Sequence, residues 1–396
     1  MQLTERIQIK KGTAEYVELD RACFLSKNLY NAALYAVRQH FFQTGKHKSD
    51  FTLDKEFIST KNPDYYAMNT QVSQQVLKLV DRNFKSFFSL VKKGIKVRIP
   101  KYLPKNGRQV LTFTIQRISK PALKQGYIKL AGIESRFKIR DDIQNVACVR
   151  VVPRPTFDCY DVEVVYNIPD TEMKQDNGRY AAIDLGVSNL ATVSFNCGKP
   201  FIVNGRPLKS INQFYNKRQS KCRDLKSRKA KSMNRKRDNK VRDYLHKASH
   251  MVVNQLVSRD VNTLVIGKND GWKQEANMGG RCNQTFVSIP FEKFIGMMEY
   301  KCRMAGIAVI QVNESHTSKC SFLDNEPICH HETYMGRRIK RGLFRSASGY
   351  MINADLNGSL NIMRKEVGER AFPLKNGMLD YSIEVCSTPA VVTPSK

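Results

Sequence analysis

Acidic residues are scarce in this chain of 396 residues, where 36 Asp and Glu stand against 66 Lys and Arg and leave a formal net charge of +30. A charge excess of this size attracts polyphosphate whatever the fold. The most basic stretch, residues 217–242, holds 13 basic and two acidic residues, a net +11. The rest of the excess is spread along the chain, which excludes a single basic tail on a neutral enzyme and indicates an extended surface for nucleic acid.

The chain also lacks long apolar runs. No stretch of about eighteen uninterrupted apolar residues occurs, and residues 1–6 have neither the layout of a signal peptide nor that of an Arg-rich presequence. The ten cysteines show no framework spacing, which is typical of thiols kept reduced. These absences predict a soluble, cytoplasmic or nucleoid-associated protein with no membrane partner and no disulfides.

Two different patterns divide the first half of the chain. Apolar residues recur at helical spacing in residues 23–37, and a second such stripe runs from Pro63 through residues 65–90. From Val97 onward, short alternating runs broken by Gly and Pro predict antiparallel strands of a small β-barrel. The expected strands are residues 110–115, 127–130, 147–152 and 160–166, with 3–10 as another strand of the same barrel. The helical part is then an insertion in the barrel.

A new domain is expected after the polar linker 176–179. Residues 181–184 form a buried strand that ends on Asp184, Gly186 allows a tight turn, and residues 190–195 return as the partner strand. Residues 201–203 predict a third strand. Strand, acid, glycine turn and strand in this order open a ribonuclease-H-like fold. An Asp after a strand also caps ordinary turns, so this segment alone leaves the role of Asp184 open.

Two more acids follow at comparable places. A strand at 263–267, a helix at 291–305 and a strand at 307–312 alternate as in a parallel sheet, and Glu314 comes directly after the last strand. Asp355 stands at the head of a helix, where a carboxylate is either a metal ligand or an ordinary helix N-terminal acid. Asn357 has two readings as well, support of a metal or phosphate and a hydrogen bond at the helix start.

Five segments in this order resemble the TnpB family, the transposon-encoded ancestors of the type V CRISPR effectors and relatives of Fanzor. The segments are Ala181 to Thr192, Ile266 to Gln274, Tyr300 to Cys302, His316 to Ser321 and Asn353 to Ile362. The resemblance covers essentially the whole chain. It implies an RNA-guided DNA endonuclease whose partners are a guide RNA made from the transposon end and the target DNA.

The resemblance also implies an α+β multidomain fold. We expect an N-terminal oligonucleotide-binding β-barrel with an inserted helical lobe, followed by a RuvC/ribonuclease-H-like α/β nuclease domain with a degenerate zinc-finger insertion. The expected bounds are 1–15 and 93–175 for the barrel, 16–92 for the lobe, 176–315 and 351–384 for the nuclease domain, 316–350 for the insertion and 385–396 for a disordered tail.

The middle carboxylate departs from the usual family pattern. Most TnpB proteins carry it at the end of strand 263–266, where this chain has Gly267. Some rearranged, Fanzor-like lineages carry the acid on the following strand, the place of Glu314. Neighbouring strands lie about 4.8 Å apart, so a glutamate there can reach back to a shared metal. We therefore predict that Asp184, Glu314 and Asp355 are catalytic and bind two Mg²⁺ or Mn²⁺ ions, with Asp270, Glu275 and Glu292 as other candidates for the middle ligand.

The zinc ligands of the family are mostly missing. Usual TnpB proteins have two C-x-x-C pairs between the second and third acids, whereas this chain has Cys320-Ser-Phe-Leu and Arg345-Ser-Ala-Ser. We do not expect zinc, although Cys320, Cys329, His330 and His331 are the residues from which a different site would be built. The basic segment 337–341 is expected to become ordered on nucleic acid instead.

Nucleic-acid contacts are expected chiefly along the basic stretch. The predicted contact residues are Lys217, Arg218, Lys221, Arg223, Arg228, Lys229, Arg235, Arg237, Lys268, Trp272 and Lys273. Trp272 either stacks on a base or fills the domain surface. Two other functions stay open at this point, a nuclease-dead RNA-guided repressor and a guide-independent DNA-binding accessory of a transposon. Metal-dependent cleavage separates the endonuclease from both.

Overall fold

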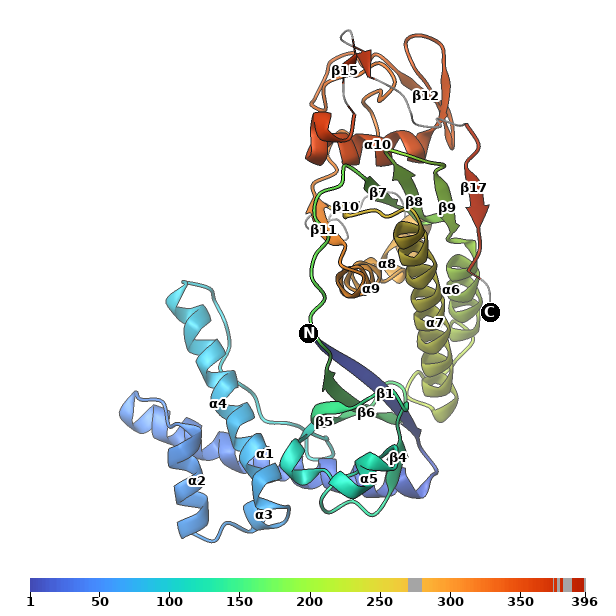
Figure 1. Cartoon of the computed structure of the whole chain (residues 1–396). Coiled ribbons are helices and arrows are strands. Elements are labelled where there is room, and N and C mark those ends of the chain that lie inside the picture. Colours follow the sequence, from blue (N-terminus) through green and yellow to red (C-terminus); the bar gives the residue numbers. More distant parts are fainter. Residues whose placement is uncertain (270–279, 373, 376–377, 380–386, 395–396) are drawn as a thin grey trace. The chain divides into compact units, whose positions relative to one another are not determined.

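The computed structural model describes residues 1–269, 280–372, 374–375, 378–379 and 387–394. It has a mixed α/β fold in two compact units, residues 1–169 and 170–396 (Figure 1). Each unit has its own sheets and its own apolar cores, and each is described by itself. No helix of the described residues is both long enough and apolar enough to cross a membrane.

The helices of the first unit confirm the predicted helical part. α1 (Ala14–Thr44) begins where the Thr13 side chain accepts a hydrogen bond from the Tyr16 amide, and it ends at Gly45, whose φ of 69° suits glycine. Three more helices follow, α2 (Asp50–Ser59), α3 (Pro63–Tyr66) and α4 (Thr70–Lys92). Their apolar stripes share one core, which includes Leu34, Phe57 and Phe84.

The strands of the first unit also follow the alternating pattern. A four-stranded antiparallel sheet has the order β1-β6-β5-β2, built from β1 (Gln2–Lys10), β2 (Leu111–Thr114), β5 (Asn145–Arg154) and β6 (Cys159–Asn167). β3 (Tyr127–Lys129) and β4 (Arg136–Lys138) form a hairpin, with η1 (Ile115–Arg117) and α5 (Lys120–Lys124) before it. β1 pairs with β6 from Gln2 to Lys10, so the helices are an insertion between β1 and β2, as expected. Closure of these strands into an oligonucleotide-binding barrel stays a prediction.

The second unit is built around a six-stranded sheet in the order β11-β10-β7-β8-β9-β17. β7 (Tyr180–Leu185) pairs antiparallel with β8 (Asn189–Phe195), which pairs with β9 (Phe201–Asn204). β10 (Thr263–Gly267) pairs in parallel with both β7 and β11 (Ala308–Val312). The predicted strands are confirmed, and so is the parallel arrangement of β10 and β11. The carboxyl ends of β7, β10 and β11 therefore lie at one edge of the sheet.

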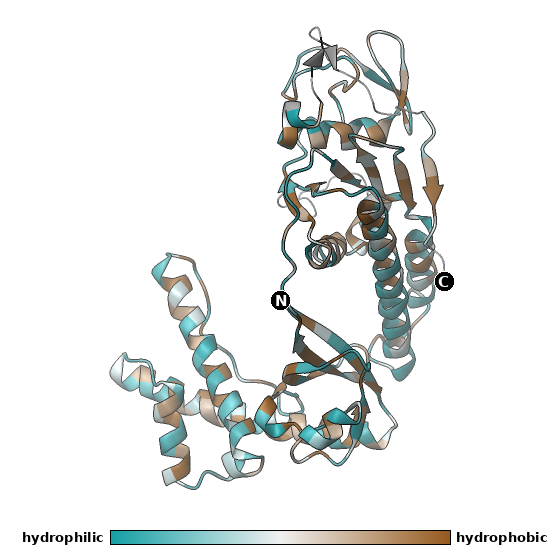
Figure 2. Cartoon of the chain, viewed as in Figure 1, coloured by the Kyte–Doolittle hydropathy of each residue, from teal (hydrophilic) through white to brown (hydrophobic). Residues whose placement is uncertain are grey.

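Helices cover both faces of this sheet, and the alternation along β7 sorts its side chains between them. Ala181 and Ile183 pack in a core with α7 (Arg228–Ser258) and α9 (Phe291–Met304). Tyr180 and Ala182 pack in a second core with α10 (Ala354–Val367). Apolar residues line the strands between the helices (Figure 2), and α6 (Arg206–Gln219) and α8 (Gly280–Ser288) complete the first layer. The period of two places Asp184 on the face of α10.

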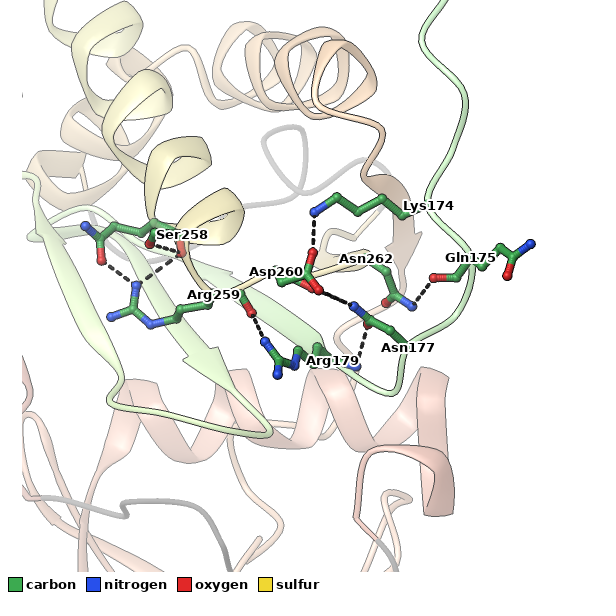
Figure 3. A network of polar contacts seen from close by, with 9 residues as sticks. Lys174, Gln175, Asn177, Arg179, Ser258, Arg259, Asp260 and Asn262 are labelled. Carbon is green, nitrogen blue, oxygen red and sulfur yellow. Dashed lines mark hydrogen bonds and ion pairs between the residues drawn. The ribbon is translucent and has the colours of Figure 1, made fainter.

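A polar network fixes the segment before β7 to the turn between α7 and β10 (Figure 3). Lys174 Nζ lies 2.8 Å from Asp260 Oδ1, and Asn177 Nδ2 donates to the same carboxylate. Asn262 Nδ2 donates to the Gln175 carbonyl. Residues 170–175, which we expected at the end of the barrel, therefore belong to the second unit. The reason is that the polar linker is held by hydrogen bonds at the edge of this sheet.

The insertion after β11 holds a small antiparallel sheet of β12 (Arg337–Lys340), β13 (Leu343–Arg345) and β14 (Met351–Asn353). The Asp324 carboxylate accepts hydrogen bonds from the Ser321 hydroxyl and from the Ala347 amide. Burial raises the pKa of Asp324, but these hydrogen bonds and those from Ser348 outweigh burial and keep the pKa below its ordinary value. Asp324 thus joins residues 320–323 to residues 345–348, the two segments that stand where usual TnpB proteins have cysteine pairs.

The end of the chain differs from the expectation of a disordered tail over 385–396. β17 (Ala390–Val392) pairs in parallel with β9 and extends the main sheet by one strand. The β-branched Val391 and Val392 suit a strand, and the free edge of β9 supplies the hydrogen-bonding partner. Before β17 lie η2 (Gly368–Arg370), β15 (Leu374–Lys375) and β16 (Met378–Leu379).

Candidate functional site

Asp184 lies near the end of β7 and faces α10. Gly358 of that helix lies directly against it, because a Cβ built on Gly358 would stand 3.1 Å from Asp184 Oδ2. A larger residue at 358 would push the helix or the carboxylate away. The glycine therefore allows α10 to pack closely enough to bring its first turn beside β7.

Asp355 lies in this first turn of α10. The helix is capped by Asn353, whose side chain accepts hydrogen bonds from the amides of Asp355 (3.0 Å) and Leu356 (3.1 Å). The Asp355 carboxylate is therefore not the cap. It accepts a hydrogen bond from Asn189 Nδ2 at 2.7 Å and pairs with the Arg338 guanidinium at 3.1 Å. Two side chains thus orient an acid whose own helix does not use it.

Glu314 follows β11 after one intervening residue and reaches back over β10. Asn269 holds it at two points, since Asn269 Nδ2 donates to Glu314 Oε1 at 3.1 Å and the Glu314 amide donates to Asn269 Oδ1 at 3.2 Å. A Cβ built on Gly267 would lie 3.1 Å from Glu314 Oε2 and would also clash with Ile362. A side chain at 267 would therefore meet Ile362 first and would also crowd the carboxylate of Glu314.

The electrostatics link the three acids. Burial raises the pKa of Asp184 well above its ordinary value, and the negative charges of Glu314 and Asp355 raise it further. Arg338 opposes this shift. Burial also raises the pKa of Glu314. A buried carboxylate whose pKa is raised further by two neighbouring carboxylates favours a proton or a cation.

The fit to a metal was tested on the donors themselves. Carboxylate oxygens are ligands suited to Mg²⁺ and Mn²⁺. Among the residues that the structure describes, however, no group of three or more His, Cys, Asp and Glu side chains is gathered tightly enough to hold a metal ion. Asp355 is turned toward Arg338, and Glu314 is turned toward Asn269. The donor chemistry fits a hard divalent cation, and closure around it requires these two carboxylates to turn.

Asp184 and Asp355 open into a cavity of about 740 Å³. Basic side chains from three elements share it, namely Lys209 of α6, Arg338 of β12 and Arg341 of the following turn. Arg341 donates to the Ser188 hydroxyl at 3.1 Å. Glu314 is not among the lining residues. A cavity with two carboxylates and several cations suits a phosphodiester.

The predicted nucleic-acid contacts fall into three groups. Lys217, Arg218, Lys221, Arg223, Arg228 and Lys229 are exposed around the connection from α6 to α7, and Arg235 is half-buried on α7. Arg237 is engaged within the protein, since it donates to Asn212 Oδ1 and to the Ser288 carbonyl. Lys268 pairs with Glu292 at 3.0 Å. Trp272 and Lys273, like the alternative acids Asp270 and Glu275, lie outside the described residues.

The candidate zinc residues have other contacts. The Cys320 thiol is buried and directed at the Cys329 carbonyl at 3.6 Å, and Cys329 Sγ lies 3.4 Å from His331 Nε2. The His330 ring contacts that of His316. Asn357, expected near a metal or at the helix start, does neither. It is buried and binds the Cys320 carbonyl and the Phe322 amide, so it fastens the insertion to α10.

Three residues of the site were not singled out from the sequence. Asn189, Asn269 and Arg338 hold the carboxylates of Asp355 and Glu314. Asn189 and Asn269 do lie inside two of the segments that carry the family resemblance. Their place in these segments is the sequence signal by which both asparagines could have been identified.

Two family models match parts of this chain. Residues 163–273 match the OrfB_IS605 family, described as a probable transposase, and residues 291–362 match the Cas12f1-like TNB domain. The TnpB-like protein ORF457 of Acidianus two-tailed virus is 23% identical over 410 residues, which cover 89% of this chain and 84% of that protein. These matches confirm the resemblance to the TnpB family.

Solved structures of CRISPR effectors are also similar to this chain. A cryo-EM structure of a Cas12f1–sgRNA–target DNA complex matches with a TM-score of 0.39 and 14% identity, over 91% of this chain and 98% of that one. CasPhi-2 (Cas12j) bound to crRNA matches with a TM-score of 0.38 and 10% identity, over 95% of this chain and 99% of that one.

Proposed function

We propose that this protein is an RNA-guided DNA endonuclease of a transposon, with Asp184, Glu314 and Asp355 as its catalytic carboxylates. The observation that carries the proposal is the convergence of these acids from β7, the end of β11 and the start of α10. The charges of Glu314 and Asp355 raise the pKa of Asp184, although the three are far apart in the sequence. The resemblance to TnpB supports a guide RNA and a target DNA as partners.

Each residue of the site has a definite role in this proposal. Asp184, Glu314 and Asp355 would hold two Mg²⁺ or Mn²⁺ ions, which when bound supply an activated water and stabilise the leaving 3′ oxygen. Asn189 orients Asp355, and Asn269 orients Glu314. Lys209 and Arg341 stand in the same cavity, where their charges would hold the scissile phosphate. Hydrolysis in this arrangement leaves 5′-phosphate ends.

A second candidate is an RNA-guided DNA-binding protein that does not cut. The ion pair between Arg338 and Asp355 favours it, since the guanidinium occupies one oxygen of a proposed metal ligand. Gly267 in place of the family's usual glutamate favours it too. In the endonuclease, Arg338 must release Asp355 when metal and substrate bind.

One experiment tests both candidates. The RNA that co-purifies with the full chain is sequenced, and a target library matched to that RNA is offered in Mg²⁺ or Mn²⁺. We expect cleavage by the wild type, no cleavage by Asp184→Ala or Asp355→Ala, and nearly unchanged RNA binding by both variants. Binding of the matched target without cleavage by the wild type would establish the second candidate. Absence of any defined RNA would favour a guide-independent accessory protein.

A further inference from the structure

A second cavity, of about 540 Å³, lies between α6 and α7. It shares no lining residue with the cavity of Asp184. The α-helical period explains the separation, because Lys209 and Gln213 face the acids while Ser210, Phe214 and Arg218, four residues apart, face this second cavity. We call it the α6–α7 cleft.

Two aromatic rings of α6 line the α6–α7 cleft, and they differ in how they are held. The Tyr215 hydroxyl donates to Asn234 Oδ1 of α7 at 2.8 Å, and the Arg237 guanidinium lies 5.7 Å from its ring centre. Phe214 is 60% exposed. The Arg218 guanidinium lies over its ring at 5.3 Å. The Tyr215 ring therefore ties the two helices together, and the Phe214 ring is exposed beside the guanidinium of Arg218.

Cations surround this exposed ring. Arg218 of α6 and Lys229, Lys236 and Lys240 of α7 line the cleft and are exposed. The three lysines lie at i, i+7 and i+11, which is one face of the helix. No Asp or Glu is found among the lining residues that the structure describes. The cleft therefore combines an exposed aromatic ring with positive charge along one helix.

We propose that the α6–α7 cleft binds an unpaired nucleotide of a nucleic-acid strand, with the base stacked on Phe214 and the adjacent phosphates held by Lys236 and Lys240. Every base has a π face, so stacking on an aromatic ring binds single strands without selecting a sequence. Arg218 adds a guanidinium plane that a base or phosphate can use. An acidic peptide would use the lysines and leave the ring without a role.

This inference extends the proposed function, and it rests on that function only because both take nucleic acid as the ligand. The cleft lies apart from the carboxylates, so binding there can be measured without cleavage. A protein that binds strands in the cleft and never cuts would refute the endonuclease and leave this inference intact.

The test uses the full chain, freed of co-purified nucleic acid, and fluorescence anisotropy with three labelled strands of equal length. These are an oligouridylate, an oligothymidylate and an abasic deoxyribose-phosphate strand. Stacking contributes about 1–3 kcal/mol per base, so Phe214→Ala should weaken binding of the base-bearing strands by about tenfold and leave the abasic strand unchanged. Phe214→Tyr should bind like the wild type. Tyr350→Ala, which removes an exposed ring elsewhere in the unit, is the matched control.

The lysines have a different signature. Lys236→Gln and Lys240→Gln should weaken all three strands, and each should reduce the slope of log affinity against log salt by about 0.7 per lost phosphate contact. A larger Phe214 effect on oligouridylate assigns the nucleotide to RNA, and a larger effect on oligothymidylate assigns it to DNA. The proposal is overturned if Phe214→Ala binds all three strands as the wild type does, or if it weakens the abasic strand as much as the base-bearing strands. It is also overturned if polyglutamate, as an acidic peptide, competes with the strands for the wild type and not for Phe214→Ala.

Discussion

Glu314 and Gly267 form a matched pair at the residue scale. The carboxylate of Glu314 lies over the α-carbon of Gly267, and a Cβ at that position would stand 3.1 Å from Glu314 Oε2. A glutamate at 267 would therefore crowd a glutamate directed inward from 314. In the proposed site, the lack of a side chain at 267 leaves room for the carboxylate of Glu314.

The first prediction concerns cleavage by variants at positions 314 and 267. Glu314→Gln should abolish cleavage as completely as Asp184→Ala, because the amide keeps the shape and loses the charge that a metal requires. Adding Gly267→Glu to Glu314→Ala, which removes the side chain beside position 267, should restore part of the cleavage, because the remaining obstacle is the flexible end of Ile362. Cleavage of a matched target is the measurement. Glu292→Gln, which alters an exposed acid paired with Lys268, is the control and should stay active. Normal cleavage by Glu314→Gln would show that the middle ligand lies elsewhere.

A second prediction concerns Asp184 and stability. The pKa of Asp184 is raised in the folded chain, so its contribution to stability is full below the ordinary carboxyl pKa and is lost as pH rises through the raised value. At neutral pH without divalent metal, Asp184→Asn should therefore stabilise the protein. A gain of about 1 kcal/mol corresponds to a rise in Tm of about 2–4 °C.

Thermal unfolding at several pH values checks this prediction. The advantage of Asp184→Asn should shrink as the pH falls, and Mg²⁺ should raise the Tm of the wild type more than that of the variant. Asp355→Asn is the contrasting variant, because Asp355 is already paired with Arg338. A Tm for Asp184→Asn below that of the wild type in metal-free buffer would contradict the electrostatic account.

The sequence analysis named three acids that the structure brings together, and it did not name the asparagines that hold two of them. Asp184 and Glu314 were visible because each stands at or just beyond the end of a patterned strand, and Asp355 because it opens a patterned helix. The hydrogen bond from Asn189 to Asp355 joins residues 166 positions apart, and no local period encodes such a contact. Asn357 was misjudged for the same reason, since its partners lie in the Cys320 to Phe322 loop.

At the scale of elements, the basic connection from α6 to α7 predicts a salt-dependent surface. The neutralising change Lys221→Gln, Arg223→Gln, Arg228→Gln removes three exposed charges. Nucleic-acid binding should weaken, and the slope of log affinity against log salt should fall by about 0.7–0.9 for each phosphate contact that is lost. Filter binding across a salt series measures this slope. Arg237→Gln is the contrasting variant and should lower stability instead, because Arg237 binds Asn212 and Ser288. An unchanged slope in the triple variant would mean that this surface meets only solvent.

The basic segment also shows where pattern reading stopped. Its charges carry no apolar code, and the sequence predicted no element there. The structure places residues 217–219 at the end of α6 and residues 228–242 in α7, which buries Val241, Leu245, Val252 and Leu256 in the core with the main sheet. Helix continues into the charged half because no Gly or Pro interrupts it. Strands such as β5 and β6 were predicted correctly because their apolar and polar residues alternate.

At the scale of the whole molecule, the two units should fold separately. No sheet and no apolar core of the described residues crosses from 169 to 170. Fragments 1–169 and 170–396 should therefore each show native secondary structure by circular dichroism and a cooperative thermal transition. A third fragment that begins at 180 should be less stable than 170–396, since it loses the network of Lys174, Asn177 and Asp260. A fragment 170–396 that fails to fold alone would contradict this division.

β17 also has a consequence for association between copies of the protein. It covers the outer edge of β9, whose Phe201–Asn204 backbone would otherwise offer unpaired amides and carbonyls. An open strand edge is a template for strand addition by another chain. Truncation before residue 387 would uncover it and should cause association that grows with protein concentration, visible by light scattering. We therefore expect this short strand to protect the edge of β9 from strand addition, and an affinity tag placed near it should leave its pairing with β9 intact.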